Sequence, residues 1–138
     1  MKVEAHLLAE DGPVVRTLQE KFPLAMAVYA FGSQVHGTAD AHSDLDLAIL
    51  VAGYADALAL WDTASDLSDI VGCAVDLLDL RAASTVMQYQ VITQGSRLWS
   101  AGTQVGLFEC YVLSEKTALD TAREPLMREI AERGSIHG

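Results

Sequence analysis

The stretch of sequence best suited to chemistry is a Gly-Ser pair followed, ten residues later, by two aspartates separated by one residue. Gly32 and Ser33 come directly after an apolar run, and Asp44 and Asp46 begin a second one. Side chains two apart on a strand point to the same face, so these two carboxylates are expected to lie together. The alternating residues of the same run point to the other face and are expected to enter the core: Leu45, Leu47, Ile49 and Val51. Adjacent carboxylates repel each other unless a cation lies between them, and their oxygens suit a hard divalent ion such as Mg²⁺.

A third carboxylate is available from another apolar run. Asp76 and Asp79 are three residues apart, so on a regular strand they face opposite ways and only one can join the pair. We select Asp76, which lies earlier in the run between Val75 and Leu77. Three carboxylates can hold two metal ions about 3.5–4 Å apart, here Mg²⁺ with Mn²⁺ as an alternative. A third aspartate near a nucleophile can also act as general base.

The Gly-Ser turn supplies a place for phosphate. A turn after a buried strand exposes backbone N–H groups at a helix start, and these can cradle phosphate oxygens together with the Ser33 hydroxyl. Gly32 permits the close approach that a Cβ would block. The alternative is an ordinary turn or helix cap, but a cap does not explain Asp46, which an unbroken apolar run follows. The pattern as a whole predicts metal-dependent nucleotidyl transfer.

The elements that would position these residues alternate between strand-like and helical patterns. Apolar runs predict a small mixed sheet of three or more strands with helices packed on it, an α/β (α+β) fold. The expected strands are 24–31, 45–51, 74–80 and a short one at 98–99; the expected helices are 14–22, 55–71 and 84–93. We expect one domain over residues 1–138, with a core at about 14–100.

The C-terminal part, 104–138, is expected to be a helical extension. It forms one long helix or two, because Pro125 should kink or divide it. An apolar stripe runs along it, and our first interpretation places this stripe in the protein's own core, with a partner surface as the alternative. Its members are Leu119, Ala122, Leu126, Met127 and Ile130.

Composition limits the possible partners and locations. The 138 residues include 19 acidic and 9 basic side chains, a formal charge of −10 that disfavours direct binding to nucleic acid. Cys73 and Cys110 are far apart, which predicts two buried thiols in a reducing cytoplasm. The longest apolar run, from Pro23 to Phe31, is shorter than the roughly 20 residues that span a bilayer. Trp61 and Trp99 are expected in the core or at its rim, with stacking on a nucleotide base as the alternative.

These residues resemble a known family. The order Gly32-Ser33, ten residues, Asp44-Leu45-Asp46 is similar to the signature of polymerase-β-type nucleotidyltransferases, and Asp76 matches their third strand carboxylate. The short chain resembles the minimal nucleotidyltransferase (MNT) group. The segment 75–99, VDLLDLRAASTVMQYQVITQGSRLW, is similar to the MntA kind of antitoxin, and the resemblance covers residues 24–99.

The resemblance implies an ATP-dependent protein adenylyltransferase. These antitoxins are encoded beside a HEPN-domain toxin, an RNase, and silence it by transferring AMP to a tyrosine. The resemblance implies metal binding by Asp44, Asp46 and Asp76, and binding of the β- and γ-phosphates by Gly32 and Ser33. Many relatives carry an arginine where this chain has His36.

No lysine or arginine occurs between positions 22 and 80, so the triphosphate has no obvious cation nearby. Arg81, Arg97 and Lys116 are the candidates to supply one. His36 and His42 flank the aspartates and are interpreted as solvated loop residues. Two other functions remain open: a nucleotidyltransferase acting on a small molecule or an RNA end, and a binding module that blocks the toxin sterically.

Overall fold

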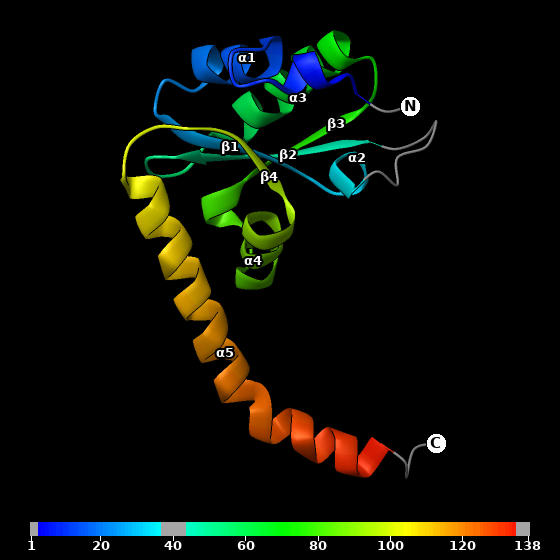
Figure 1. The fold of residues 1–138 in the computed structure, drawn as a ribbon, viewed down its shortest axis with the longest axis vertical. Coiled ribbons are helices and arrows are strands. Elements are labelled where there is room, and N and C mark those ends of the chain that lie inside the picture. The colour runs from blue at the N-terminus through cyan, green and yellow to red at the C-terminus, as the bar shows by residue number, and fades with distance from the viewer. Residues whose placement is uncertain (1–2, 37–43, 135–138) are drawn as a thin grey trace.

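The computed structural model describes residues 3–36 and 44–134 as a sheet covered by helices on both faces, with one long helix extending away (Figure 1). The four strands are β1 (Ala25–Phe31), β2 (Leu45–Val51), β3 (Val75–Asp79) and β4 (Ser96–Ser100). The helices are η1 (Ala5–Leu8), α1 (Pro13–Lys21), α2 (Ser33–His36), α3 (Ala57–Val71), η2 (Leu80–Ala82), α4 (Thr85–Gln94) and α5 (Gln104–Gly134). The predicted mixed sheet with helices and a C-terminal helical extension is confirmed.

The sheet has the strand order β3-β2-β1-β4. β1 pairs antiparallel with both β2 and β4, whereas β2 and β3 are parallel and are connected through α3. The parallel connection requires a crossover, which the 15-residue α3 provides. As a result, the end of β1 and the beginnings of β2 and β3 lie at the same end of the sheet.

Short polar residues and glycine define where the helices begin and end. The Asp56 side chain caps α3 by accepting a hydrogen bond from the Ala59 backbone N–H at 2.9 Å. Gly72 ends α3 in the left-handed conformation, with φ of 79°. Ser84 caps α4 by accepting from the Met87 N–H at 3.2 Å. These caps satisfy backbone groups that a helix end leaves without partners, which explains the sharp transitions into β3 and α4.

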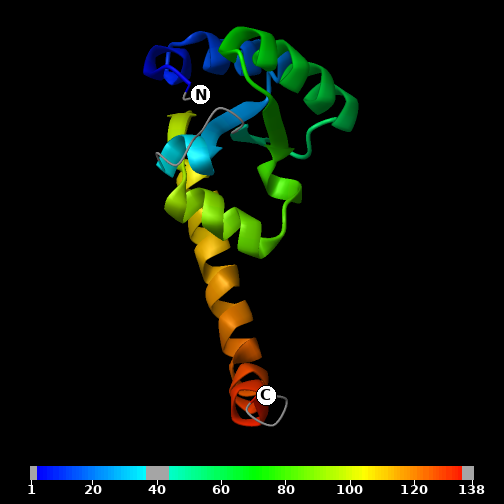
Figure 2. The same ribbon diagram turned by 90° about the vertical axis from the view of Figure 1, so that its right-hand side faces the viewer.

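Two apolar clusters lie on opposite faces of the sheet. On one face, α1 and α3 pack on the side chains of Leu45, Leu47 and Ile49, as the alternation in the sequence predicted. On the other face, α4 and the first part of α5 pack on Ala48 and Leu50. β2 is therefore buried on both faces, as a central strand between two helical layers is expected to be. Figure 2 shows the two layers on either side of the strands.

Helix α5 divides into an anchored part and a protruding part. Val105, Phe108 and Val112 are buried against the sheet. The Tyr29 hydroxyl donates a 2.7 Å hydrogen bond to Glu109, which also pairs with Arg97 of β4 at 3.1 Å. Burial, followed by this hydrogen bond and the charge of Glu109, raises the pKa of the Tyr29 hydroxyl. The anchored part is thus attached by both packing and a part-buried hydrogen bond.

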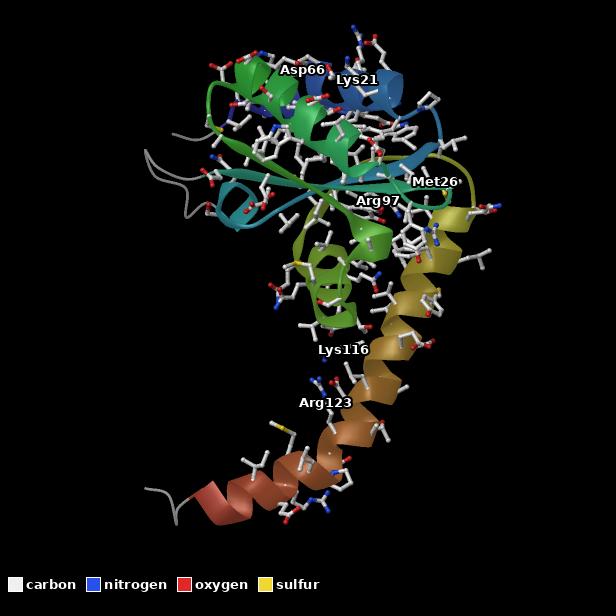
Figure 3. All side chains as sticks on the ribbon, turned by 180° about the vertical axis from the view of Figure 1, so that it is seen from behind. Lys21, Met26, Asp66, Arg97, Lys116 and Arg123 are labelled. Carbon is white, nitrogen blue, oxygen red and sulfur yellow. The ribbon has the colours of Figure 1, made fainter. Side chains whose placement is uncertain are left out.

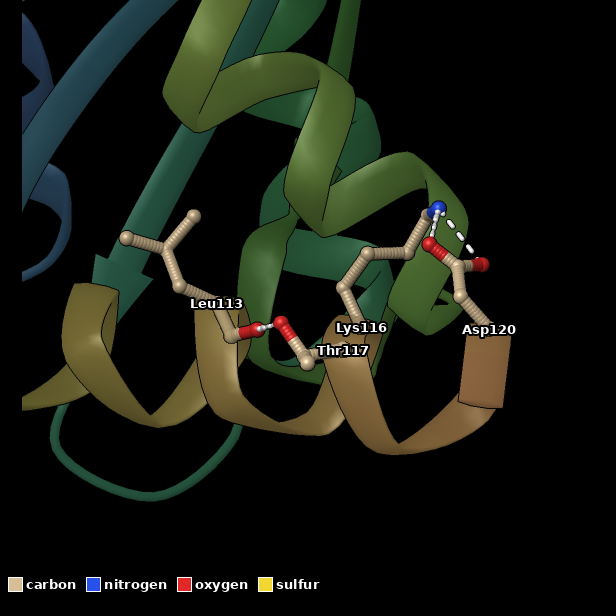
Figure 4. A network of polar contacts seen from close by, with 4 residues as sticks. All are labelled: Leu113, Lys116, Thr117 and Asp120. Carbon is tan, nitrogen blue, oxygen red and sulfur yellow. Dashed lines mark hydrogen bonds and ion pairs between the residues drawn. The ribbon is translucent and has the colours of Figure 1, made fainter. Parts of the chain in front are cut away.

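In the protruding part, residues 121–131, every side chain is exposed. Leu126, Met127 and Ile130 are 53–58% exposed, so the interpretation that placed them in the protein's own core is wrong. The helix bends in its orange part (Figure 1), and Pro125, which the sequence predicts to kink or divide it, lies inside the helix. Two side-chain contacts lie along the middle of α5 (Figure 4). The Thr117 hydroxyl donates a hydrogen bond to the Leu113 carbonyl at 2.9 Å, and Lys116 pairs with Asp120.

The structure also tests the expectations for the tryptophans, the cysteines and membrane-spanning segments. Trp61 is 77% exposed on α3, so its placement in the core is wrong, whereas Trp99 is partly buried against the first cluster. Cys110 is exposed and Cys73 is half-buried, so the prediction of two buried thiols is also wrong. Within the described ranges, no helix combines the length and apolar character needed to cross a membrane.

Candidate active site

The register of the two parallel strands brings two of the three predicted carboxylates side by side. Asp46 of β2 is paired with Asp76 of β3, on strands that lie about 4.8 Å apart in a sheet. Asp44 lies two residues before Asp46, just outside β2. Asp46 is half-buried, whereas Asp44 and Asp76 are exposed. The three carboxylates therefore gather at one end of the sheet and remain open to solvent.

The electrostatics of Asp46 show that the three carboxylates interact. Burial raises the pKa of the Asp46 carboxyl above its ordinary value of 3.8, and the negative charges of Asp76 and Asp44 raise it further. This order of causes means that the folded chain holds Asp46 in a place that disfavours its ionised form. A cation between the carboxylates would remove that cost. The cluster thus has the charge distribution of a cation-binding site.

Gly32 approaches the same cluster from β1. The last residue of β1, Phe31, is paired with Asp46, and Gly32 follows it with φ of 80°. A Cβ on Gly32 would lie well inside van der Waals contact with the Asp46 carboxylate. We expected Gly32 to make room for phosphate. The structure shows that Gly32 makes room for Asp46, a requirement that only the pairing of β1 with β2 reveals.

Ser33 begins α2 directly after Gly32 and is half-buried. The turn that connects β1 to α2 therefore lies at the end of the sheet where the carboxylates gather. The predicted turn and short helix are present over Gly32–His36. His42, like the rest of 37–43, lies outside the described residues, as does the side chain of His36.

The structure separates Asp76 from its neighbour Asp79. Asp79 is 8% exposed, and its carboxylate accepts hydrogen bonds from the Ala55 N–H at 2.8 Å and the Arg81 N–H at 3.1 Å. These contacts connect the end of β3 to the loop before α3. Asp79 thus has a structural role, and Asp76 is the aspartate of β3 that stands beside Asp46.

The carboxylates suit a metal ion by chemistry, but they do not already enclose one. Among the described residues, no three acidic, histidine or cysteine side chains converge closely enough to hold a metal ion. Repulsion among three carboxylates without a cation favours such spreading. The donor oxygens and the mutual electrostatic effect on Asp46 fit Mg²⁺, with Asp44, Asp46 and Asp76 as the candidate ligands.

The three basic residues considered for the triphosphate are engaged elsewhere. Arg81 donates to the Val51 carbonyl at 3.2–3.3 Å and lies over the Phe108 ring, at the opposite end of β2 from Asp46. Arg97 pairs with Glu109. Lys116 lies on α5, where it contacts Asp120 at 2.6–2.8 Å and lies over the Tyr89 ring of α4 (Figure 4 shows the contact with Asp120). These contacts leave metal ions and backbone N–H groups to neutralise a bound triphosphate.

The fold and the carboxylate pair define a nucleotidyltransferase. Residues 14–104 match the family described as "Polymerase beta, Nucleotidyltransferase", and the chain belongs to this family. Its sheet, flanking helices and C-terminal helix form a minimal nucleotidyltransferase fold.

More specific similarities come from individual proteins. The chain is 34% identical over 120 residues to protein adenylyltransferase MntA of Shewanella oneidensis, covering 87% of this chain and 86% of the relative. A crystal structure of a toxin–antitoxin with AMP-PNP is 35% identical, with a TM-score of 0.77 over 86% of this chain and 95% of the other. A re-refined structure of a tri-AMPylated Shewanella oneidensis HEPN toxin in complex with an MNT antitoxin is 32% identical, with a TM-score of 0.70 over 86% and 92%.

Proposed function

We propose that this chain is a protein adenylyltransferase antitoxin that transfers AMP from ATP to a HEPN-domain toxin and thereby silences it. The observation that carries the proposal is the pairing of Asp46 with Asp76 beside Gly32, in a chain 34% identical to an MntA adenylyltransferase. The solved relatives with AMP-PNP and with an AMPylated HEPN toxin support the nucleotide and the acceptor. Use of ATP also agrees with the cytoplasmic location that the sequence predicts.

The proposed reaction follows from the arrangement of the side chains. A hydroxyl oxygen of the acceptor attacks the α-phosphorus of ATP, a new P–O bond forms, and the bond to pyrophosphate breaks. Asp76, exposed at the start of β3, accepts the hydroxyl proton. Asp44 and Asp46 would hold Mg²⁺, which when bound supplies charge neutralisation for the triphosphate and the leaving group.

The Gly-Ser turn has the complementary task of positioning the nucleotide. Gly32 and Ser33 bind the β- and γ-phosphates, with the backbone at Gly32 able to approach because no Cβ is present. The described basic side chains considered above are engaged elsewhere, so we expect strict dependence on a divalent metal.

A steric contribution to neutralisation is favoured by one observation, the exposed Leu126, Met127 and Ile130 of α5. Removing part of α5 tests this contribution. A truncation after Gly106 is too short for the test, because it removes the buried Phe108 and Val112 together with the exposed stripe and would damage the core. A truncation after Ala118 removes the exposed stripe and leaves these anchors in place. If α5 binds the toxin, this shorter chain retains its fold but loses co-purification with the toxin.

The decisive experiment uses the product of the neighbouring gene, which we expect to be a HEPN-domain protein. The two proteins are mixed with ATP and Mg²⁺, and the HEPN protein is weighed by intact-mass spectrometry. We expect mass increases in steps of one AMP, absent with the Asp44→Asn/Asp46→Asn variant. A stable complex without any mass increase would show that neutralisation is steric. Neither complex nor mass increase would redirect the search to small-molecule or RNA acceptors.

A further inference from the structure

The edge of the sheet next to the candidate carboxylates carries a groove that the proposed reaction has not used. β3 is the last strand in the sheet order, so one side of its backbone has no neighbouring strand in the described chain. A groove of about 510 Å³ lies between this edge and α3. Its lining from β3 includes Val75, Asp76 and Leu77, so the groove and the candidate site share a strand.

The helix side of the groove is one continuous stripe. The lining residues of α3 recur at helical spacing and are small or apolar: Ala57, Leu60, Trp61, Ala64, Ser65 and Ser68. Trp61 is 77% exposed although it is a large aromatic side chain. An exposed tryptophan at the rim of an apolar groove is the type of residue that anchors a partner. The small residues keep the rest of the groove open.

The groove follows the edge of β3 and is lined by residues from both faces of that strand. Val75 and Leu77 pack with the cluster beneath α3, whereas Leu78 packs with the cluster on the other face. Asp76, which alternates with Val75 and Leu77, therefore faces the same side as Leu78. A ligand that runs along the edge of β3 would contact both faces.

We propose that the acceptor protein presents its modified hydroxyl in an extended segment that adds to the free edge of β3. Successive side chains of an added strand point to opposite faces, so one apolar side chain enters the groove beside Trp61 and its neighbour in the sequence faces Asp76. Backbone hydrogen bonds to β3 fix the register. This inference rests on the proposed function, because it takes the acceptor to be a protein.

The acidic residues around the groove indicate the charge of the acceptor segment that would bind there. Asp62 and Asp69 flank the lining stripe of α3 and are exposed. The neighbouring Asp66 already pairs with Lys21 at 3.7 Å (Figure 3). Since no lysine or arginine occurs between positions 22 and 80, the segment that binds here is neutral or basic apart from its apolar anchor.

Kinetics with a matched pair of variants test the groove. Trp61→Ala should raise the KM for the acceptor protein about tenfold and leave the KM for ATP unchanged. Leu58→Ala is the control, because Leu58 is 67% exposed on the same helix but does not line the groove. Equal kinetics for Trp61→Ala and the control would overturn the inference. No transfer by the unaltered chain would instead overturn the proposed function, and the inference with it.

Hydrogen exchange and acceptor variants test the added strand. With the inactive Asp44→Asn/Asp46→Asn variant, ATP and the acceptor protein, backbone amides of β3 should become protected. In the acceptor, replacing the apolar residue adjacent to the modified one by alanine should slow transfer, and replacing residues two positions away should not. Unchanged exchange in β3 would overturn the inference. So would a dimer of this chain alone that Trp61→Ala dissociates, because the edge would then bind a second copy.

Discussion

Asp76 and Asp79 occupy opposite ends of the short strand β3 and differ in all their surroundings. Asp76 is exposed and stands beside another aspartate, whereas Asp79 is 8% exposed and accepts two backbone hydrogen bonds. A carboxylate that the fold satisfies stabilises the fold. A carboxylate cluster that the fold leaves unsatisfied costs stability and is available to a ligand. The comparison therefore assigns the two ends of the strand to different tasks, which the following variants test.

The largest effect is expected from Asp46→Asn. This change should lower AMP transfer at least about 10³-fold, because it removes a candidate metal ligand at the reacting phosphate. It should also raise the melting temperature measured without metal, because it removes the cost of burying a charge and the repulsion from Asp76 and Asp44. Glu20→Gln is the control for net charge, because it also removes one negative charge but lies at an exposed position on α1. Retained transfer would contradict the assignment of this end of the sheet to catalysis.

Gly32→Ala should act on the same end through the backbone. The added Cβ would collide with the Asp46 carboxylate and displace it, with an expected loss of about 10²-fold in transfer. Gly53→Ala is the matched control, because Gly53 has φ of 86° but open space around it. Both variants carry the backbone cost of a positive φ, so their difference in activity isolates the collision. Equal activities would show that the contact with Asp46 is unimportant.

Asp79→Ala should instead lower the stability of the fold. The Ala55 and Arg81 N–H groups would lose their acceptor, at an expected cost of about 2–4 kcal/mol in the free energy of unfolding. Urea denaturation measures this loss, and transfer per folded molecule should remain near its original level. Asp76→Ala, on the same strand, should show the reverse: little loss of stability and a large loss of transfer. If Asp79→Ala and Asp76→Ala lowered the free energy of unfolding equally, the proposed difference between the two ends of β3 would be wrong.

The smallest effect is expected in the pH dependence of stability. The pKa of Asp46 is higher in the folded chain than its ordinary value of 3.8, so folding favours the protonated form. Its contribution to stability is therefore present below that value and is lost as the pH rises through the folded-state pKa. In a metal chelator, the stability advantage of Asp46→Asn over the unaltered chain should grow from pH 3.8 toward neutrality. A constant difference would contradict the effect of burial and neighbouring charge on Asp46.

The elements of the fold were accessible from local patterns. Apolar runs predicted strands at 24–31, 45–51 and 74–80, and the structure has them within one residue at each end. Helical spacing predicted α1 and α4 within one residue at each end and α3 within two. The faces of β2 were also predicted in part: Leu45, Leu47 and Ile49 do enter the core. The burial of Ala48 and Leu50 was missed, because a second helical layer is a tertiary feature.

The exposed residues were the least predictable. Trp61 and the stripe of Leu126, Met127 and Ile130 have the types and spacing of core residues, yet they are exposed. Helical periodicity shows that apolar residues share a face, but it does not show whether anything in the same chain covers that face. The direction of α5 away from the sheet decides this.

The sequence by itself determined the local order of strands and helices, and which side chains of β2 share a face, because side-chain direction follows from backbone period. Only the tertiary structure decided that Asp76 pairs with Asp46, that Asp79 is satisfied by Ala55 and Arg81, and that Gly32 leaves space for a carboxylate. These contacts join residues from different strands and loops. Their register depends on the packing of the whole sheet between its two helical layers, which no local pattern contains.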